Sequence, residues 1–279
     1  MPSAKKILVL CWICCISIIL HGKDTKPATL EQAEKDLKVL FSAMTLSRND
    51  AERTRLADSI ACLINLTLKL PGAFDYPFDS IRTMGKITSG DANLRIFTWN
   101  LPHTNGTNRY YGFLQYKSPD NILVFQLTDK SEDLPDPAQC SLSADQWYGA
   151  LIYEIIEKKD AGTKYYTLLG YDPHNLFISR KITDVLYFTE NNEPLFGSPV
   201  FHYQNRKQCR IVFEYSAKVQ MSMRWNENLK MIVFDHLSPS NPLYKGNYQY
   251  YGPDFSYDGF KFENGIWELV EDVNARNSE

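Results

Sequence analysis

From Ile87 onward, short runs of aromatic and β-branched residues alternate with turn-rich breaks, and this spacing constrains the fold more than any other feature. The runs repeat with a period of two, which is typical of β-strands. The expected strands are residues 93–99, 109–116, 121–128, 147–157, 164–171, 199–204, 209–218, 219–225, 229–236, 258–263 and 266–271. Most breaks are too short for the crossover that joins parallel strands, so we expect mainly antiparallel pairing. One short helix is expected within this region, over residues 176–186.

Asn264-Gly265 predicts a tight β-hairpin near the end of the chain, because both central residues of a type I′ turn need a positive φ. Counting outward from the turn gives four cross-strand pairs: Glu263–Ile266, Phe262–Trp267, Lys261–Glu268 and Phe260–Leu269. Large apolar pairs thus alternate with more polar ones, as in a half-buried hairpin.

The segment before this hairpin spaces Asp254, Ser256 and Asp258 like the oxygen ligands of a calcium loop. The twelfth position of an EF-hand is a bidentate glutamate, whereas here it is Gly265 of the hairpin turn. Asp, Ser and Gly are also the usual residues of ordinary turns. We therefore expect no metal and no cofactor, with a differently built Asp-rich calcium loop as the alternative.

Two amphipathic helices are expected before the strands. The first begins at Thr29, with Gln32 three residues later as in a capping box, and Asp50 can cap the second. Apolar residues recur at three- and four-residue steps in both helices: Leu30, Ala33, Leu37, Leu40 and Met44, then Leu56, Ile60, Leu63, Thr67 and Leu70. Pro71-Gly72 ends the second helix, and so short a connection predicts an αα-hairpin.

These patterns predict an α+β fold in which an N-terminal helical hairpin leads into a large, mainly antiparallel β-sheet region. The expected segments are a signal peptide over residues 1–22, the helical hairpin over 23–84, packed on the following domain, and a β-rich domain over 85–279.

Residues 1–22 have the pattern of a secretory signal peptide. Lys5 and Lys6 precede an apolar run over residues 7–20, which is shorter than the roughly 20 residues of a spanning helix. An uncleaved membrane anchor is the alternative; lipidation is disfavoured because the leader's cysteines lie inside the apolar run. We therefore expect export to the periplasm or cell surface and a soluble mature chain with no transmembrane span.

Loss of Lys5 and Lys6 with the leader would change the formal net charge from −3 to −5. A mildly acidic chain without a basic run lacks the electrostatic signature of a nucleic-acid-binding protein. The mature chain would keep Cys62, expected as a small buried residue of the second helix, and Cys140 and Cys209. Whether the last two form a disulfide does not follow from their spacing.

The chain carries no local catalytic motif. Its histidines after the leader stand apart without zinc spacing: His103, His174, His202 and His236. Asp235-His236 is an acid–histidine pair, but adjacent side chains of an extended strand point to opposite faces. There is no Gly-x-Ser-x-Gly elbow and no Gly-rich phosphate loop. We therefore assign no catalytic, cofactor-binding or metal-binding residue.

Aromatic doublets stand within or beside the expected strands: Tyr110-Tyr111, Tyr165-Tyr166 and Tyr250-Tyr251. Neighbours on a strand face opposite ways, so each doublet places one ring on each face. An exposed aromatic face can stack on a sugar or anchor a protein partner. The other interpretation, which we favour, is that protein covers both faces of the sheet.

Four segments, LLGYD (168–172), FEYSA (213–217), FDHLSP (234–239) and YGPDFSYDGF (251–260), resemble a family of exported proteins of Gram-negative anaerobic bacteria. The similarity covers most of the chain from about residue 90. This resemblance implies a periplasmic or surface location and supplies neither an activity nor catalytic residues.

The sequence thus favours an exported binding or envelope-assembly protein whose partner is a protein or glycan of the cell envelope. A periplasmic hydrolase acting on glycan, peptidoglycan or peptide is the alternative, because active-site residues often lie far apart in sequence. A cleft that gathers His236, Asp235 or other carboxylates with displaced pKa values would favour the enzyme, whereas an exposed aromatic face without convergent polar groups would favour binding. The most informative observation is whether His236, Asp254 and Asp258 converge in one cleft.

We predict that the exported protein begins near Lys23, because charged residues follow the apolar run directly. N-terminal sequencing of the mature protein measures this. Recovery of Met1 in the membrane fraction would identify the segment as an anchor instead.

Overall fold

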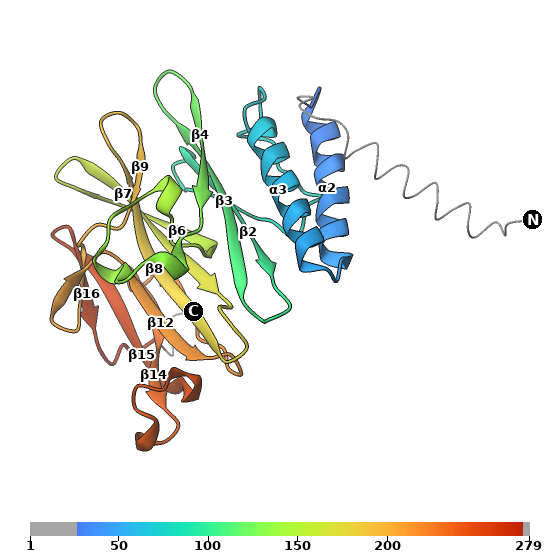
Figure 1. The fold of residues 1–279 in the computed structure, drawn as a ribbon. Helices are drawn as coiled ribbons and strands as arrows, with labels where there is room; N and C mark the ends of the chain where they lie inside the picture. Colours follow the sequence, from blue (N-terminus) through green and yellow to red (C-terminus); the bar gives the residue numbers. More distant parts are fainter. Residues whose placement is uncertain (1–26, 276–279) are drawn as a thin grey trace, which may run out of the picture.

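The computed structural model describes residues 27–275, so the expected signal peptide, residues 1–22, lies outside the described residues. Within this described part of the chain, two α-helices come first and three β-sheets follow (Figure 1). The predicted α+β fold, a helical hairpin leading into mainly antiparallel sheet, is confirmed. Neither of the two described helices is both long and apolar enough to cross a membrane.

The helices α2 (Leu30–Leu46) and α3 (Asp50–Thr67) lie side by side. Thr29 caps α2 as expected, since its hydroxyl accepts the backbone N–H three residues on, at 3.2 Å. The cap of α3 is Asn49 and not Asp50, so that expectation was wrong by one residue. Asn49 keeps an extended backbone and its side-chain oxygen accepts an N–H of the first turn at 3.1 Å, the geometry that a cap requires.

The first sheet has the order β1-β2-β3-β4, and the middle sheet has the order β5-β9-β8-β7-β6 with β12 also paired to β8. The third sheet has the order β11-β10-β16-β15-β14-β13. Among the strands described, β10 and β16 form the one parallel pair. The bounds are β1 (Gly85–Thr88), β2 (Leu94–Pro102), β3 (Asn108–Lys117), β4 (Ile122–Thr128), β5 (Leu142–Ser143), β6 (Leu151–Asp160), β7 (Thr163–Asp172), β8 (Ile178–Phe188), β9 (Pro194–Phe196), β10 (Phe201–Tyr203), β11 (Arg206–Gln208), β12 (Ile211–Ser216), β13 (Met223–Asn226), β14 (Met231–Pro239), β15 (Tyr251–Glu263) and β16 (Ile266–Val270).

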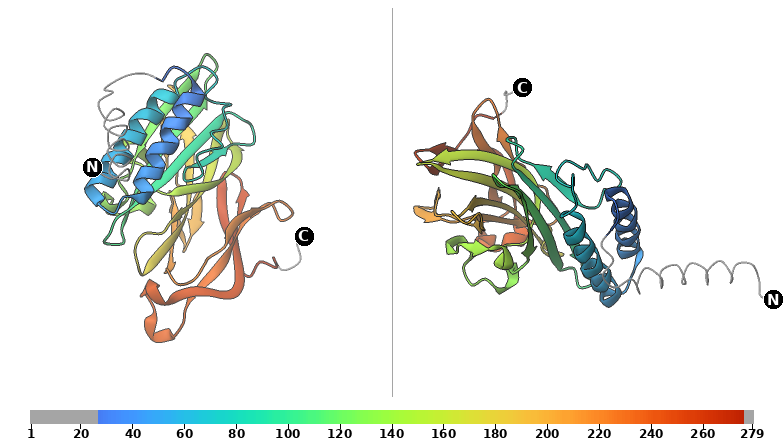
Figure 2. Two further views of the ribbon diagram at one scale, coloured as in Figure 1. Left: turned by 90° about the vertical axis from the view of Figure 1, so that its right-hand side faces the viewer. Right: turned by 90° about the horizontal axis from the view of Figure 1, so that it is seen from above.

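The helices and the three sheets stack as four layers (Figure 2). The helical hairpin covers the first sheet, where the rings of Phe41 and Trp99 lie 5.6 Å apart. The first sheet packs on the middle sheet through a second apolar core, and the middle sheet packs on the third through a core that contains Trp267. Two of the sheets are therefore covered on both faces.

This layering explains two of the three aromatic doublets. Tyr110 and Tyr111 are both buried, one in the core toward the middle sheet and the other in the core toward the helices. Tyr166 is buried and Tyr165 packs on the core of the next layer. Protein thus covers both faces at these positions, as we favoured, and exposed aromatic residues occur elsewhere.

The expected helix over residues 176–186 is wrong, because this segment contains most of β8 (Ile178–Phe188). β8 lies inside the middle sheet and pairs with β7, β9 and β12. Residues 182–186 are all buried, so the apolar and polar residues do not alternate as on a half-exposed strand. Such a run cannot be told from a buried helix by its period alone.

The hairpin at Asn264-Gly265 is confirmed, and all four predicted cross-strand pairs occur in the predicted register. Both turn residues have a positive φ, 48° and 80°. A side chain at Gly265 would also collide with the carboxylate of Asp160 on the neighbouring β6–β7 turn.

The three cysteines in the described residues are free thiols. Cys62, expected to be buried, is exposed, because the buried face of α3 is formed by residues such as Ala61 and Ile64 on either side. Cys140 and Cys209 both lie next to Gly197 and carry no disulfide.

A buried ion pair lies in the middle sheet, and its arginine also contacts the loop that precedes β5. Arg210 is fully buried, and its Nε donates to Oδ2 of Asp184 on β8 at 2.9 Å. Its Nη1 donates to the backbone carbonyls of Pro137 and Cys140. Arg210 therefore fixes residues 137–140 against the sheet at the start of β12.

We expect Trp267→Ala to cost about 3–5 kcal/mol of unfolding free energy, as usual for a buried aromatic residue. Trp267 is fully buried, its indole N–H donates to Thr167 at 3.1 Å, and its ring contacts Phe262 at 5.1 Å. Urea unfolding measures this change. Leu243→Ala is the control, because Leu243 is 89% exposed. Equal, small effects of both variants would contradict the observed core.

Candidate functional site

An irregularity in the pairing of β14 with β15 positions His236. Its two neighbours pair with Tyr257 and Pro253, so His236 alone faces residues 254–256. A bulge of this kind bends the strand and re-aims a side chain, and bulges are frequent beside active sites. At its tip Phe255 has φ 71° and is 83% exposed, an uncommon conformation for a residue other than glycine.

His236 lies between two carboxylates. Its Nδ1 is 2.7 Å from Oδ2 of Asp258, and its Nε2 is 4.0 Å from Oδ2 of Asp254. The hydrogen bond with Asp258 raises the pKa of His236, against the opposing effect of partial burial. The half-exposed imidazole is thus held at Nδ1 while its Nε2 faces the other carboxylate.

Both carboxylates are themselves anchored. Asp254 accepts the backbone N–H and the hydroxyl of Ser256, at 3.1 and 2.7 Å. Burial alone would raise the pKa of Asp254, but these hydrogen bonds outweigh it and lower the pKa. Asp258 also accepts the N–H of Asp272 at 3.2 Å, from the segment after β16.

The spacing that resembles a calcium loop therefore corresponds to the bulge of β15. Asp254 caps the turn that contains Ser256, and both Asp254 and Asp258 lie beside His236. Across residues 27–275, no group of three or more His, Cys, Asp or Glu side chains is placed to hold a metal ion. That this segment binds no calcium stays a prediction, and an unchanged melting temperature in millimolar calcium would support it.

A second histidine–carboxylate pair lies nearby. The parallel pairing of β10 with β16 places His202 opposite Glu268, and their Nδ1 and Oε2 atoms are 2.7 Å apart. Both side chains are about half exposed, at 44% and 45%.

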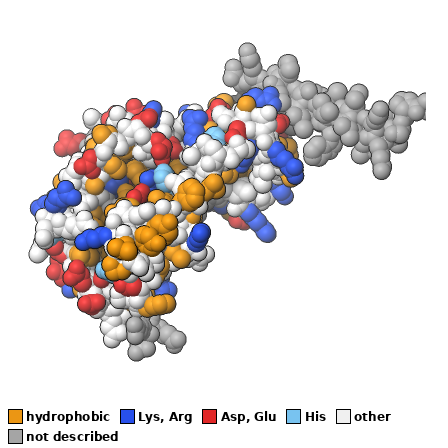
Figure 3. Space-filling model, turned by 60° about the horizontal axis from the view of Figure 1, so that its bottom comes forward, with side chains coloured by type: hydrophobic (Ala, Val, Ile, Leu, Met, Phe, Trp, Pro, Cys, Tyr) orange, Lys and Arg blue, Asp and Glu red, His pale blue; other side chains and the backbone are white. Residues whose placement is uncertain are grey.

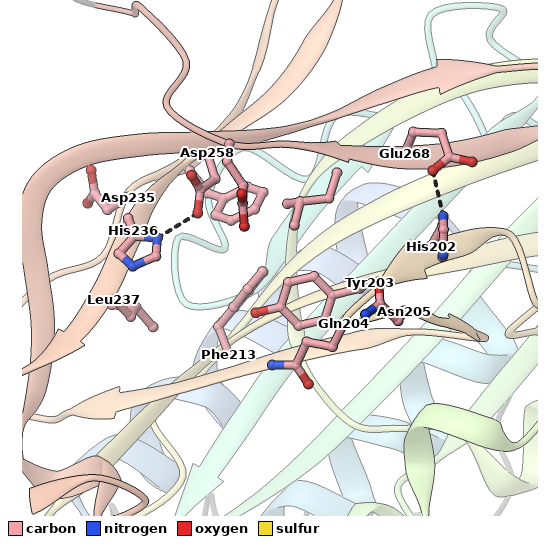
Figure 4. Close-up of a pocket in the computed structure, with 13 residues that line it drawn as sticks. His202, Tyr203, Gln204, Asn205, Phe213, Asp235, His236, Leu237, Asp258 and Glu268 are labelled. Atoms are coloured by element: carbon pink, nitrogen blue, oxygen red, sulfur yellow. Dashed lines mark hydrogen bonds and ion pairs between the residues drawn. The ribbon is translucent and has the colours of Figure 1, made fainter.

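A cavity of about 610 Å³ lies between the two pairs. His236 with Asp258 and His202 with Glu268 lie on opposite sides of it, and Tyr203 lies between them (Figure 4). The convergence of His236 and Asp258 in one cleft is thus observed, whereas Asp254 touches His236 from outside the cavity lining.

A second cavity, of about 630 Å³, continues from the first. The two share four lining residues, and we call them together the groove: Tyr203, Gln204, Phe213 and Leu237 are common to both. Gln204 and Asn205 form the β10–β11 turn with φ of 51° and 60°, which presents their amides to the groove.

The two ends of the groove differ in charge. The described residues that line the first cavity include no Lys or Arg. They include four carboxylates: Asp235, Asp258, Glu268 and Glu271. Cations line the second: Arg180, Arg206 and Lys245. Arg180 is partly neutralised, since its Nε lies 2.8 Å from Glu214 and its Nη1 lies 3.4 Å from Asp172.

The connection from β14 to β15, residues 240–250, forms a tyrosine loop at the mouth of the second cavity. The rings of Tyr244 and Tyr250 stack at 4.1 Å, and both remain about 40% exposed. Tyr248 contacts Tyr251 at 5.0 Å, and both line the cavity. The loop projects from the body of the protein in Figure 1, and Figure 3 shows hydrophobic side chains gathered on the face that includes it.

Of the remaining residues considered from sequence, Asp235 lines the first cavity, whereas His103 and His174 line neither cavity. The carboxylate of Asp235 accepts the N–H of Ser222 at 2.6 Å, so Asp235 and His236 do not form a dyad, in agreement with the strand argument. His174 lies near Asp172 in another network, and His103 lies at the β2–β3 turn. The convergence of His236 with Asp258 was raised from the sequence as a possibility without being predicted, and the pair of His202 with Glu268 was missed. Each pair depends on strand pairing between segments that are separate in the sequence.

We expect Asp258→Asn to lower the pKa of His236, because it removes the accepting carboxylate. An NMR pH titration of the imidazole protons measures this. The folded pKa is raised, so the stabilisation by this pair is complete below about pH 6.5 and is lost as the pH rises through the folded pKa. Glu268→Gln, beside the other histidine, is the control. An unchanged His236 midpoint in Asp258→Asn would contradict the geometry.

Comparison with known proteins adds nothing to this geometry. The chain matches no protein-family model, no curated protein and no solved structure.

Proposed function

We propose that this chain is an exported envelope protein that binds an extended glycan in the groove. Export is supported by the signal-peptide pattern of residues 1–22 and by the resemblance to exported proteins of Gram-negative anaerobes. The observation that carries the binding role is the groove itself, with two connected cavities of about 610 and 630 Å³.

The lining suits sugars. Tyr203, Tyr248 and Tyr251 supply amphipathic rings, which can stack on the apolar face of a pyranose and hydrogen-bond its hydroxyls. Gln204 and Asn205 add amides, which both donate and accept hydrogen bonds as sugar hydroxyls require.

The size and charge of the groove narrow the ligand further. A single ligand pocket typically measures about 300–1,000 Å³, so two connected cavities fit a chain of sugar units better than one small molecule. The four carboxylates of the first cavity disfavour a polyanion at that end. We infer a neutral or amino-bearing glycan in the first cavity.

A hydrolase acting on glycan, peptidoglycan or peptide is the second candidate, and the His236–Asp258 pair favours it. Asp258 holds Nδ1, which leaves Nε2 of the same ring to exchange a proton with a bound substrate or water. The described linings of the two cavities contain no Ser, Thr or Cys, so hydrolysis there would use water or a carboxylate of the lining as the nucleophile.

We expect the mature protein to bind oligosaccharides on a printed glycan array, and Tyr248→Ala to weaken that binding. Loss of one stacking ring should cost at least about 1 kcal/mol, or roughly a fivefold rise in Kd. Phe177→Ala is the matched control, because Phe177 is 63% exposed and lines neither cavity. Titration calorimetry with a bound oligosaccharide measures both variants.

Three outcomes separate the candidates. Intact oligosaccharide after incubation supports a binding protein. Shortened products that disappear in His236→Gln support the hydrolase. A folded protein that binds no oligosaccharide on the array contradicts both glycan proposals and leaves a protein partner of an envelope assembly as the occupant to test.

A further inference from the structure

Lys181 on β8 occupies an unusual position for a cation. Its Nζ lies 4.2 Å from the ring centre of Tyr153 and 5.2 Å from that of Tyr171. The hydroxyl of Tyr153 donates to the carbonyl of Met223 at 2.8 Å, so this ring is fixed in place. The rings favour the charged form of the amine, because a cation is attracted to the face of an aromatic ring.

This ammonium group has no counter-ion among residues 27–275. It forms no ion pair and no hydrogen bond there, and burial alone lowers its pKa with no carboxylate acting against it. By contrast, Arg210 pairs with Asp184, and Arg180 pairs with Glu214. Lys181 is half-buried, and a bound anion would supply the counter-ion that the described part of the chain does not provide.

A cavity of about 380 Å³ opens onto Lys181, between β1 and β2 of the first sheet and β6–β8 of the middle sheet. Leu151 and Ile152 give it an apolar wall, and Thr98 and Asn100 add polar groups. The described lining holds no Asp or Glu and shares no residue with the groove. It therefore forms a separate site, independent of the glycan proposal.

We propose that this cavity binds a small organic acid, with Lys181 pairing to its carboxylate and the apolar wall contacting its hydrocarbon part. The ammonium group is held in place by the two tyrosine rings, so little side-chain freedom is lost on binding. Partial burial strengthens an ion pair relative to one at an open surface. A neutral ligand of the same shape would gain only the apolar contact.

The test uses phenylacetate and its neutral isostere phenylacetamide, each titrated into the mature protein by calorimetry or NMR. We expect phenylacetate to bind at millimolar concentration and phenylacetamide to bind about tenfold more weakly or not at all, since a charge-assisted contact is lost. Added salt should weaken only the binding of phenylacetate.

Lys181→Met should reduce phenylacetate binding to the level of phenylacetamide, and Lys181→Arg should retain part of it. Lys159→Met, on the exposed side of β6, is the matched control and should bind as wild type. Equal binding of the two ligands by wild type, no binding of phenylacetate, or full binding by folded Lys181→Met would each overturn the proposal. The comparison of the two ligands on wild-type protein decides the matter even if a variant fails to fold.

Discussion

The buried ion pair between Arg210 and Asp184 holds the parts of the groove together. Arg210 connects β8 to the carbonyls of Pro137 and Cys140, and Pro137 lines the second cavity. Breaking such a pair by removing one partner leaves an uncompensated buried charge and costs about 3–5 kcal/mol, whereas replacing both by apolar residues is often neutral. Its contribution is therefore mainly positional: it fixes β12 and the loop over it in one arrangement.

The groove forms where two sheets separate. Phe213 of β12 comes from the middle sheet, while Tyr203 and His236 come from the third. A ligand in the groove would touch both sheets at once, and a small change in their packing would move the walls. The histidine–carboxylate pairs lie within the third sheet, so their geometry is set by strand pairing rather than by the contact between sheets.

Local signals in the sequence predicted much of the fold. Asn264-Gly265 specified its hairpin and register because a type I′ turn sets the pairing of the residues beside it. The helical hairpin could be predicted because each helix has one polar and one apolar face, which gives the sequence a helical period. The strand β8 could not be recognised from its sequence, because protein covers it on both faces and its residues do not alternate between apolar and polar. The site was not predictable either: His202 meets Glu268 across a separation of 66 residues, through a parallel pairing that no local pattern encodes.

The four layers follow one another in nearly the same order as the chain: helices, first sheet, middle sheet, third sheet. A chain that emerges N-terminus first during synthesis can therefore add each layer to a surface already present. The strand β12 breaks this order, because β10 and β11 of the third sheet precede it, yet it returns to β8 of the middle sheet. The last two layers are thereby interleaved, and neither can be finished before the other has begun.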